Sequence, residues 1–311
     1  MVIKFRYFEK NFIFLALILV TLFFSAITDN FFSKITLFTI LNQLPALMTI
    51  SIGMTLVLII SGIDLSVGSI QGLSSAIVGS SMMLLELNLA SACMLGILAG
   101  LICGIINGSL TAKLALPSFI VTLGMLEVAR GFSYLATNSQ TIYIGSTIQW
   151  IASPLPHINL SPSLIFSIIL VVISHFVLTQ TIFGRYLIAI GTNEKAALMS
   201  GINAKPLKII VFSLSGLLAG IAGIFNTAYL GAADPNAGFG LELAAIAAAV
   251  IGGTSLMGGR GSIIGTFAGV LIIAVLQNGL AQAGATETTK KIITGLVIIL
   301  AVIIDRWRSR S

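Results

Sequence analysis

Charged residues are scarce in this sequence. Lys and Arg number 16 and Asp and Glu 10 among 311 residues, so only 8% of the chain is charged while 57% is apolar. An ordinary soluble domain is about one quarter charged, and so few charges cannot cover the core that a chain of this length would form. The scarcity excludes a water-soluble globular domain and indicates that lipid covers much of the surface.

Residues for catalysis and metal binding are also rare. His157 and His175 have no Cys, Asp or Glu nearby at metal-ligand spacing, and Cys93 and Cys103 lie in one apolar run that offers no disulfide framework. The sequence contains neither Gly-x-Ser-x-Gly nor His-Glu-x-x-His, and it lacks the Gly-x-x-x-x-Gly-Lys-Ser/Thr phosphate loop. We therefore expect no catalytic residue, metal or cofactor in this chain. If ATP drives the protein, we expect its hydrolysis to take place in another chain. No dense basic patch with interleaved aromatics occurs, which argues against nucleic-acid binding.

What the sequence does have is a series of long apolar runs. A bilayer core about 30 Å thick needs about 20 helical residues, and ten runs approach that length. The first follows Lys4-Phe5-Arg6, and we interpret it as a span because no small-residue cleavage site comes after it. The sequence predicts an all-α integral membrane protein with a single transmembrane domain over residues 1–311. The predicted spans are residues 12–28, 44–61, 69–86, 90–112, 117–137, 163–181, 209–230, 242–255, 262–282 and 290–304, the eighth being short and rich in alanine.

The distribution of Lys and Arg predicts the orientation. If the N-terminus is cytoplasmic, twelve of the sixteen basic residues fall in cytoplasmic segments, whereas Lys34, Lys290 and Lys291 fall outside and Arg130 lies within a span. Cytoplasmic loops of membrane proteins carry such an excess of basic residues. We therefore expect both termini in the cytoplasm, with residues 182–208 as the largest and most basic cytoplasmic loop.

Charged residues inside the spans are nearly absent. An ion-coupled transporter or a channel usually carries a relay of Asp, Glu or His in the membrane, and its absence favours transport driven from outside the chain. An ion-coupled secondary transporter of a small polar solute remains the alternative. The exception is Glu127 with Arg130, one turn apart in the fifth span and spaced to pair on one helix face. The two residues could neutralise each other, or Arg130 could snorkel toward the outer surface. Alternatively, they could form a gate or line the solute path.

Residues 59–69 carry the first carboxylate inside the apolar region. Gly62 and Gly68 bracket Asp64 and Ser66, both favourable helix N-cap residues. One interpretation is a capped turn between two spans. The other is a broken helix whose freed polar groups line a solute path, because non-helical backbone at membrane depth persists beside a cavity. The sequence leaves both open.

A short helix is predicted in the large cytoplasmic loop. Asn193, or the threonine before it, can cap a helix over residues 194–200, which Gly201 then ends in the left-handed conformation. Leu198 and Met199 give this polar segment an apolar surface. Such a helix could lie on the membrane or dock into a groove on a soluble partner.

Three segments together resemble the ribose-type branch of bacterial ABC sugar permeases. They are residues 62–68 (Gly-Ile-Asp-Leu-Ser-Val-Gly), residues 191–202, and residues 252–259 with their two Gly-Gly pairs, and the resemblance covers about residues 44–306. It implies a ten-helix ABC permease fold that works as a dimer, most simply a homodimer. A periplasmic or lipid-anchored sugar-binding protein would deliver the solute, and a cytoplasmic ATP-binding subunit would drive the permease. Residues 182–208 are similar to the family's coupling loop, in which the residues facing the ATPase would be Asn193, Glu194, Leu198 and Gly201.

The resemblance also implies the import of a monosaccharide, ribose or a similar pentose or hexose, across the inner membrane of a bacterium. A sugar needs hydroxyl and amide partners along its path, because an unpaired buried polar group costs about 1–3 kcal/mol. Each such side chain can instead bond a neighbouring helix. The candidate path residues at membrane depth are Asp64, Ser66, Asn107, Ser118, Thr122, Gln277 and Asn278.

Overall fold

The computed structural model describes residues 2–29 and 31–308, and the side chains of residues 13–29, 31–303, 305 and 306. The prediction of a helical membrane protein is confirmed, since six helices among the described residues are long and apolar enough to cross a membrane. These are α2 (Lys34–Ile59), α4 (Leu89–Lys113), α5 (Ser118–Thr137), α7 (Pro162–Gln180), α10 (Ala204–Leu230) and α12 (Ile263–Gln282).

Four further helices coincide with the other predicted spans. They are α1 (Val2–Ile27), α3 (Val67–Met83), α11 (Leu241–Ile251) and α13 (Glu287–Arg308). The total of ten membrane crossings stays a prediction. The connections contain the short helices α6 (Ser146–Gln149), α8 (Ile182–Thr192) and α9 (Glu194–Met199), and the strands β1 (Ile142–Tyr143) and β2 (Ala232–Ala233), which pair antiparallel.

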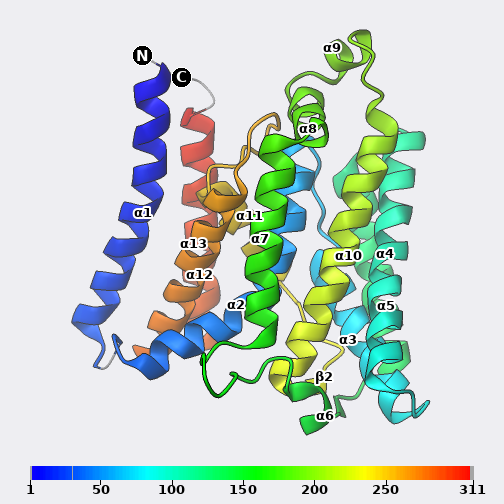
Figure 1. Cartoon of the computed structure of the whole chain (residues 1–311), viewed down its shortest axis with the longest axis vertical. Helices are drawn as coiled ribbons and strands as arrows, with labels where there is room; N and C mark the ends of the chain where they lie inside the picture. Colours follow the sequence, from blue (N-terminus) through cyan, green and yellow to red (C-terminus); the bar gives the residue numbers. More distant parts are fainter. Residues whose placement is uncertain (1, 30, 309–311) are drawn as a thin grey trace.

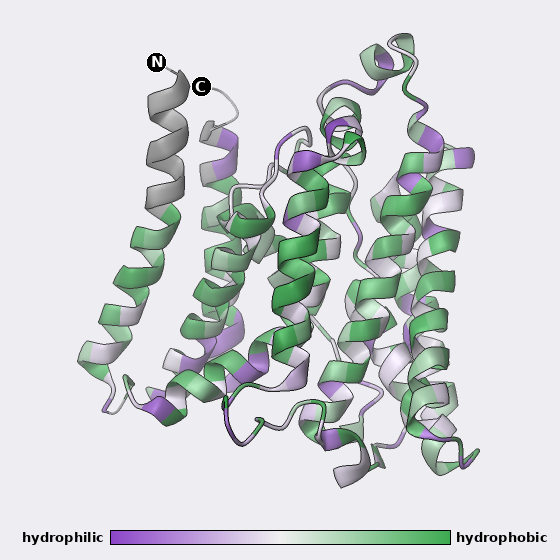
Figure 2. Cartoon of the chain, viewed as in Figure 1, coloured by the Kyte–Doolittle hydropathy of each residue, from purple (hydrophilic) through white to green (hydrophobic). Residues whose placement is uncertain are grey.

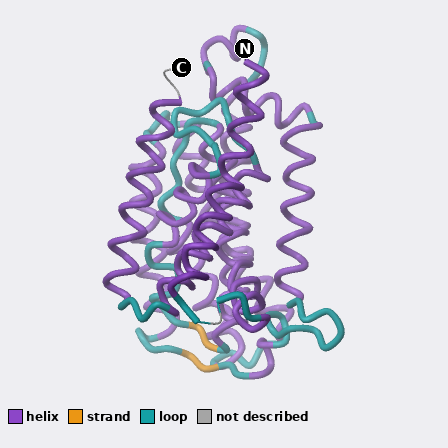
Figure 3. The backbone as a smooth tube through the Cα atoms, turned by 90° about the vertical axis from the view of Figure 1, so that its left-hand side faces the viewer, coloured by secondary structure: helices purple, strands orange, loops and turns teal. Residues whose placement is uncertain are grey.

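The long helices stand side by side in one bundle with two distinct ends (Figure 1). Helix α9, the start of α1 and the end of α13 lie at one end, here called the α9 end. The strand pair and α6 lie at the other, here called the strand end, and a view turned by 90° shows the same separation (Figure 3). Hydrophobic residues dominate the middle of the helices and hydrophilic residues gather toward the two ends (Figure 2). This banding is what a protein that spans a bilayer requires.

The tightest helix pair is α4 with α10, and glycine is the reason. A Cβ built on Gly100 would lie 3.0 Å from the Cα of Gly220, and one built on Gly216 would lie 2.8 Å from the Cα of Gly104. Lipid tails are as apolar as the helix surfaces, so close backbone approach rather than the hydrophobic effect holds membrane helices together. The glycines on the facing sides of α4 and α10 therefore allow these two helices to pack closely.

Helix α2 begins well before the predicted residue 44. Ser33 caps it by accepting a hydrogen bond from the backbone N–H of Thr36 at 3.1 Å. Pro45 lies within the helix, and the helix runs first across the strand end before turning into the bundle (Figure 1). Proline removes one helical hydrogen bond and bends a helix without having to end it.

Two elements interrupt the pattern of continuous helices. Residues 62–66 are non-helical and run from the end of α2 back into the bundle, where α3 begins (Figure 1). Residues 234–240 are also non-helical and lead from the strand end to the start of α11. Helix α11 has 11 residues, about 16 Å at 1.5 Å per residue, so it covers only about half of a bilayer core. These segments are called the first break and the second break below.

Candidate functional site

Helix α9 forms as the loop sequence predicts. The Asn193 side chain accepts a hydrogen bond from the N–H of Ala196 at 3.0 Å. At the other end Gly201 has φ +82°, and its N–H donates to the Leu198 carbonyl at 3.0 Å. Such an arrangement needs a residue tolerant of positive φ and satisfies carbonyls that the last turn leaves free. The capping of α9 is thus confirmed, and its role in coupling stays a prediction.

The outer surface of α9 is apolar although the helix lies at an end of the bundle. Leu198 is 63% exposed and Met199 is 92% exposed, while Ala197 is buried beneath them. Figure 1 shows α9 as the most protruding element of the α9 end. Large apolar side chains on a protruding segment are typical of a contact with another molecule.

Glu194 has a partner within the chain. Its carboxylate accepts a hydrogen bond from Nζ of Lys208, in the first turns of α10, at 2.8 Å. This ion pair ties α9 to α10. The pair is partly exposed, and pairs of this kind contribute about 0–1 kcal/mol.

Helix α8 is an element that the sequence analysis missed within residues 182–208. The hydroxyl of Thr181 accepts from the N–H of Gly184 at 3.4 Å and caps the start of α8. A threonine before a largely apolar run was the available signal.

The end of α2 is joined by hydrogen bonds to two other parts of the chain, namely the end of α8, just before α9, and the loop between α11 and α12. Ser61, just after α2, donates its hydroxyl to the carbonyls of Gly191 at 3.1 Å and Met257 at 3.0 Å. The N–H of Gly259 donates to the carbonyl of Ile59 at 2.8 Å. These five residues, here called the three-way junction, connect the end of α2, the end of α8 and the loop between α11 and α12.

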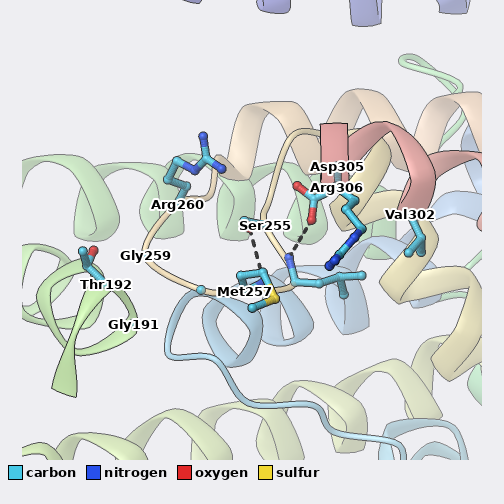
Figure 4. A pocket seen from close by; sticks show the side chains of 11 residues that line it. Gly191, Thr192, Ser255, Met257, Gly259, Arg260, Val302, Asp305 and Arg306 are labelled. Carbon is cyan, nitrogen blue, oxygen red and sulfur yellow. Dashed lines mark hydrogen bonds between the residues drawn. The ribbon is translucent and has the colours of Figure 1, made fainter. Parts of the chain in front are cut away.

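A cavity of about 590 Å³ opens beside the junction at the α9 end. Figure 4 shows its lining, with Met257 between the junction and the end of α13. The carboxylate of Asp305, from α13, accepts a hydrogen bond from the N–H of Leu256 at 3.2 Å. Arg260 and Arg306 also line this cavity, so the last turns of α13 meet the same loop that the junction holds.

The first break is held by a buried carboxylate. Asp64 accepts hydrogen bonds from the N–H of Ser66 at 3.0 Å and from its hydroxyl at 2.6 Å, and Ser215 of α10 donates to the other oxygen at 2.9 Å. Asn107 of α4 donates to the Ser66 hydroxyl at 2.9 Å. Ser66 makes no side-chain cap of α3, so it is fixed by the Asp64 and Asn107 bonds instead.

Two residues of α5 satisfy the backbone of the same break. The Ser118 hydroxyl accepts from the N–H of Ile63 at 3.0 Å, and Thr122 accepts from the N–H of Leu65 at 3.1 Å. The structure thus brings together five of the predicted path residues, but Asp64 and Ser66 have no exposed surface. In this conformation they hold the broken backbone rather than line an open path.

Gln277 and Asn278 lie apart from that cluster. Asn278 donates to the Gln43 side chain at 3.0 Å, and Gln43 donates to the Tyr229 hydroxyl at 2.8 Å. Gln277 is exposed and takes no part in these bonds. The contact joins α2, α10 and α12, and the sequence analysis named neither Gln43 nor Tyr229.

The predicted ion pair between Glu127 and Arg130 is wrong. Nη1 of Arg130 donates to the carbonyls of Pro235 at 2.7 Å and Ala237 at 2.9 Å, and Arg130 is 9% exposed. Glu127 is exposed, and the ion pairs of the described residues include Lys208 with Glu194 and Lys290 with Glu287, neither of which involves Glu127 or Arg130. The reason is the second break, whose carbonyls have no helical partners and need a donor in the bundle interior.

A family comparison identifies the kind of protein that carries these features. The family model described as "Branched-chain amino acid transport system / permease component" matches residues 36–302. The chain belongs to this permease family.

Individual relatives agree with the family assignment. The ribose import permease protein RbsC of Escherichia coli K12 is 40% identical over 310 residues, covering 96% of each chain. Its counterpart in Bacillus subtilis is 39% identical over 95% of this chain and 92% of its own. The fructose import permease protein FrcC of Rhizobium meliloti is 36% identical over 89% of this chain and 79% of its own. No solved structure was found to match.

Within this permease, α5 is the element common to both breaks. Its first half holds the first break through Ser118 and Thr122. Its second half holds the second break through Arg130, through Ser133, which donates to Pro235 at 3.2 Å, and through Tyr134, which donates to Asn236. A movement of α5 would therefore change both segments of non-helical backbone together.

Proposed function

We propose that this chain is the membrane-spanning permease subunit of an ATP-binding-cassette importer for a monosaccharide, ribose or a similar pentose or hexose, in the inner membrane of a bacterium. The observation that carries the proposal is the 40% identity to a ribose import permease over 96% of the chain. Relatives named for fructose and D-allose import support a monosaccharide as the substrate class. They favour an importer over the ion-coupled alternative, and the lack of a phosphate loop in this sequence supports ATP hydrolysis by a separate subunit.

The proposed partners follow from the two ends of the bundle. A cytoplasmic ATPase binds the exposed apolar residues of α9, Leu198 and Met199, and a sugar-binding protein delivers the solute at the strand end. A second copy of the permease completes the path. When the ATPase closes on ATP, displacement of α9 acts through the three-way junction on the end of α2 and on the loop between α11 and α12. Both breaks are then re-oriented and access alternates between the two sides.

The proposed topology has ten spans and both termini in the cytoplasm. Single cysteines replacing Ser146 and Ser200, in a background lacking Cys93 and Cys103, should react with an impermeant thiol reagent from outside and from inside respectively. Both positions are exposed, so each is accessible to reagent on its own side. Labelling of the two cysteines from the same side of sealed vesicles would contradict this topology.

The function is tested by reconstitution. The permease, copurified with its ATPase and supplied with sugar-loaded binding protein, should move a radiolabelled monosaccharide across liposomes only when ATP is present. Collapsing proton and sodium gradients should leave that uptake intact. Uptake that persists without the ATPase and stops with the ion gradient would establish the ion-coupled alternative.

A further inference from the structure

The second break ends in an exposed aromatic ring beside charged groups. Phe239 is 78% exposed, and its ring centre lies 6.0 Å from Cζ of Arg130 and 5.8 Å from Nζ of Lys291. Glu242, in the first turn of α11, is half-buried. A Cβ added to Gly68 would overlap its carboxylate, so Glu242 lies against the start of α3.

This surface extends from Lys291, near the strand-end start of α13, to Glu242, deep in the bundle. Helix α11 rises only about 16 Å from its first turn to the α9 end, which sets Glu242 near the middle of a bilayer core about 30 Å thick. Glu242 is the first residue of the span predicted at residues 242–255, so the sequence did not mark it as a charge within the membrane. Glu127 of α5, exposed one turn before Arg130, lies on the same helix at similar depth.

A lipid environment does not fit these residues. An ionisable side chain in the hydrocarbon region is costly, and such residues face the bundle interior or a water-filled path. Nη1 of Arg130 already donates hydrogen bonds to the carbonyls of Pro235 and Ala237. These bonds hold the segment that leads to Phe239, and they leave Arg130 less able to pair with the carboxylate of Glu242. The exposed side of Phe239 and Glu242 must therefore face water or another protein chain.

We propose that Phe239 and Glu242 form a solute-contacting surface in the sugar path of this permease, an inference that rests on the proposed function. The aromatic ring offers a rigid apolar face for the C–H face of a sugar ring, and the carboxylate accepts hydrogen bonds from sugar hydroxyls. A few polar groups beside an apolar wall are the usual composition of a small-molecule site. Arg130 acts as a positioning residue because it holds the carbonyls that lead to Phe239.

Cysteine accessibility separates a water-filled path from lipid. In a background lacking Cys93 and Cys103, Phe239→Cys should react with a charged, impermeant thiol reagent, and the transported sugar delivered by its binding protein should slow the reaction. The matched control is Val172→Cys in the middle of α7, where the side chain is 62% exposed on the described chain; it should not react, because lipid covers it. Equal inertness of both cysteines would overturn the proposal. So would spontaneous disulfide-linked dimers of Phe239→Cys without labelling, because the surface would then be a contact between two permeases.

A transport measurement tests the role of the carboxylate. Glu242→Gln should lower the maximal rate of ATP-driven uptake about tenfold, the effect of one lost charge-assisted hydrogen bond. The concentration of loaded binding protein that gives half the maximal rate should not change, because that protein docks outside the bilayer. Glu287→Gln, which alters an 80% exposed acid at the start of α13, should behave as wild type.

The outcomes distinguish this inference from the proposed function. If wild type shows no ATP-driven monosaccharide uptake, the proposed function fails. If wild type transports and Glu242→Gln transports equally fast, the solute-contacting surface alone is refuted. A loss of assembled complex in Glu242→Gln, measured by size-exclusion chromatography with the ATPase, would make Glu242 a structural residue and would also refute it.

Discussion

Replacing Gly191 with alanine is expected to abolish ATP-driven uptake. A Cβ at this position would overlap the carbonyl oxygen of Ile59 and lie 2.5 Å from the amide nitrogen of Gly259. Both are backbone atoms, so the clash cannot be relieved by turning a side chain, and the cost lies at or above the upper end of the about 1–3 kcal/mol that is typical of overpacking. The junction must open, which separates α9 from the end of α2 and from the loop after α11.

Two further variants distinguish the junction from a general loss of stability. Gly131→Ala places a methyl group where nothing lies within 4 Å, so its thermal stability and uptake should match or exceed wild type. Ser61→Ala removes the hydroxyl proton that is shared between the carbonyls of Gly191 and Met257, a loss of about 1 kcal/mol in total, and should reduce uptake partially. Fluorescence-detected size exclusion reports folding and the liposome assay reports uptake. If Gly191→Ala transported as well as Gly131→Ala, the close backbone contact would not matter for coupling.

Several predicted spans begin within one residue of a helix in the structure. The span predicted at residues 90–112 is α4, which Asn88 caps by accepting a hydrogen bond from the N–H of Ser91 at 2.9 Å. The span predicted at 163–181 is α7, capped by Ser161. The start of α2 was missed because Pro45 bends this helix without ending it. An apolar run predicts which residues lie in lipid. The end of a helix depends on hydrogen bonds between residues that are close in sequence, so a short-range pattern can predict it.

The candidate site was predictable only where its contacts are local. Helix α9 is capped by Asn193 and ended by Gly201, which are adjacent to it in sequence. The bond from Arg130 to Pro235 joins residues 105 apart, and that from Ser215 to Asp64 joins residues 151 apart. The periodic spacing of residues in a helix or a strand cannot predict contacts between residues so far apart in sequence. The sequence therefore offered Arg130 a partner three residues away, while folding gave it the carbonyls of the second break.

The second large effect is expected from α9 itself, where Gly201→Val and Glu194→Lys should abolish uptake and sugar-stimulated ATP hydrolysis together. Gly201 has φ +82°, and a β-branched residue there costs about 1–2 kcal/mol of strain, enough to re-aim the short helix. Glu194→Lys removes the ion pair with Lys208 and sets two like charges side by side. Neither site lies in a predicted span, so insertion and abundance should stay near wild type while association with the ATPase weakens.

Gly284→Val is the matched control for this result. Gly284 also has positive φ, +78°, and an added Cβ meets nothing within 4 Å there or at Gly201. The two valines thus introduce the same backbone strain at opposite ends of the bundle, since Gly284 follows α12 at the strand end. Size exclusion of the complex and uptake into liposomes should show a loss for Gly201→Val only. Equal losses for Gly201→Val and Gly284→Val would attribute the effect to backbone strain in general. Normal uptake by Gly201→Val and Glu194→Lys would remove α9 from the coupling mechanism, because no contact of this helix would then be needed to couple ATP hydrolysis to transport.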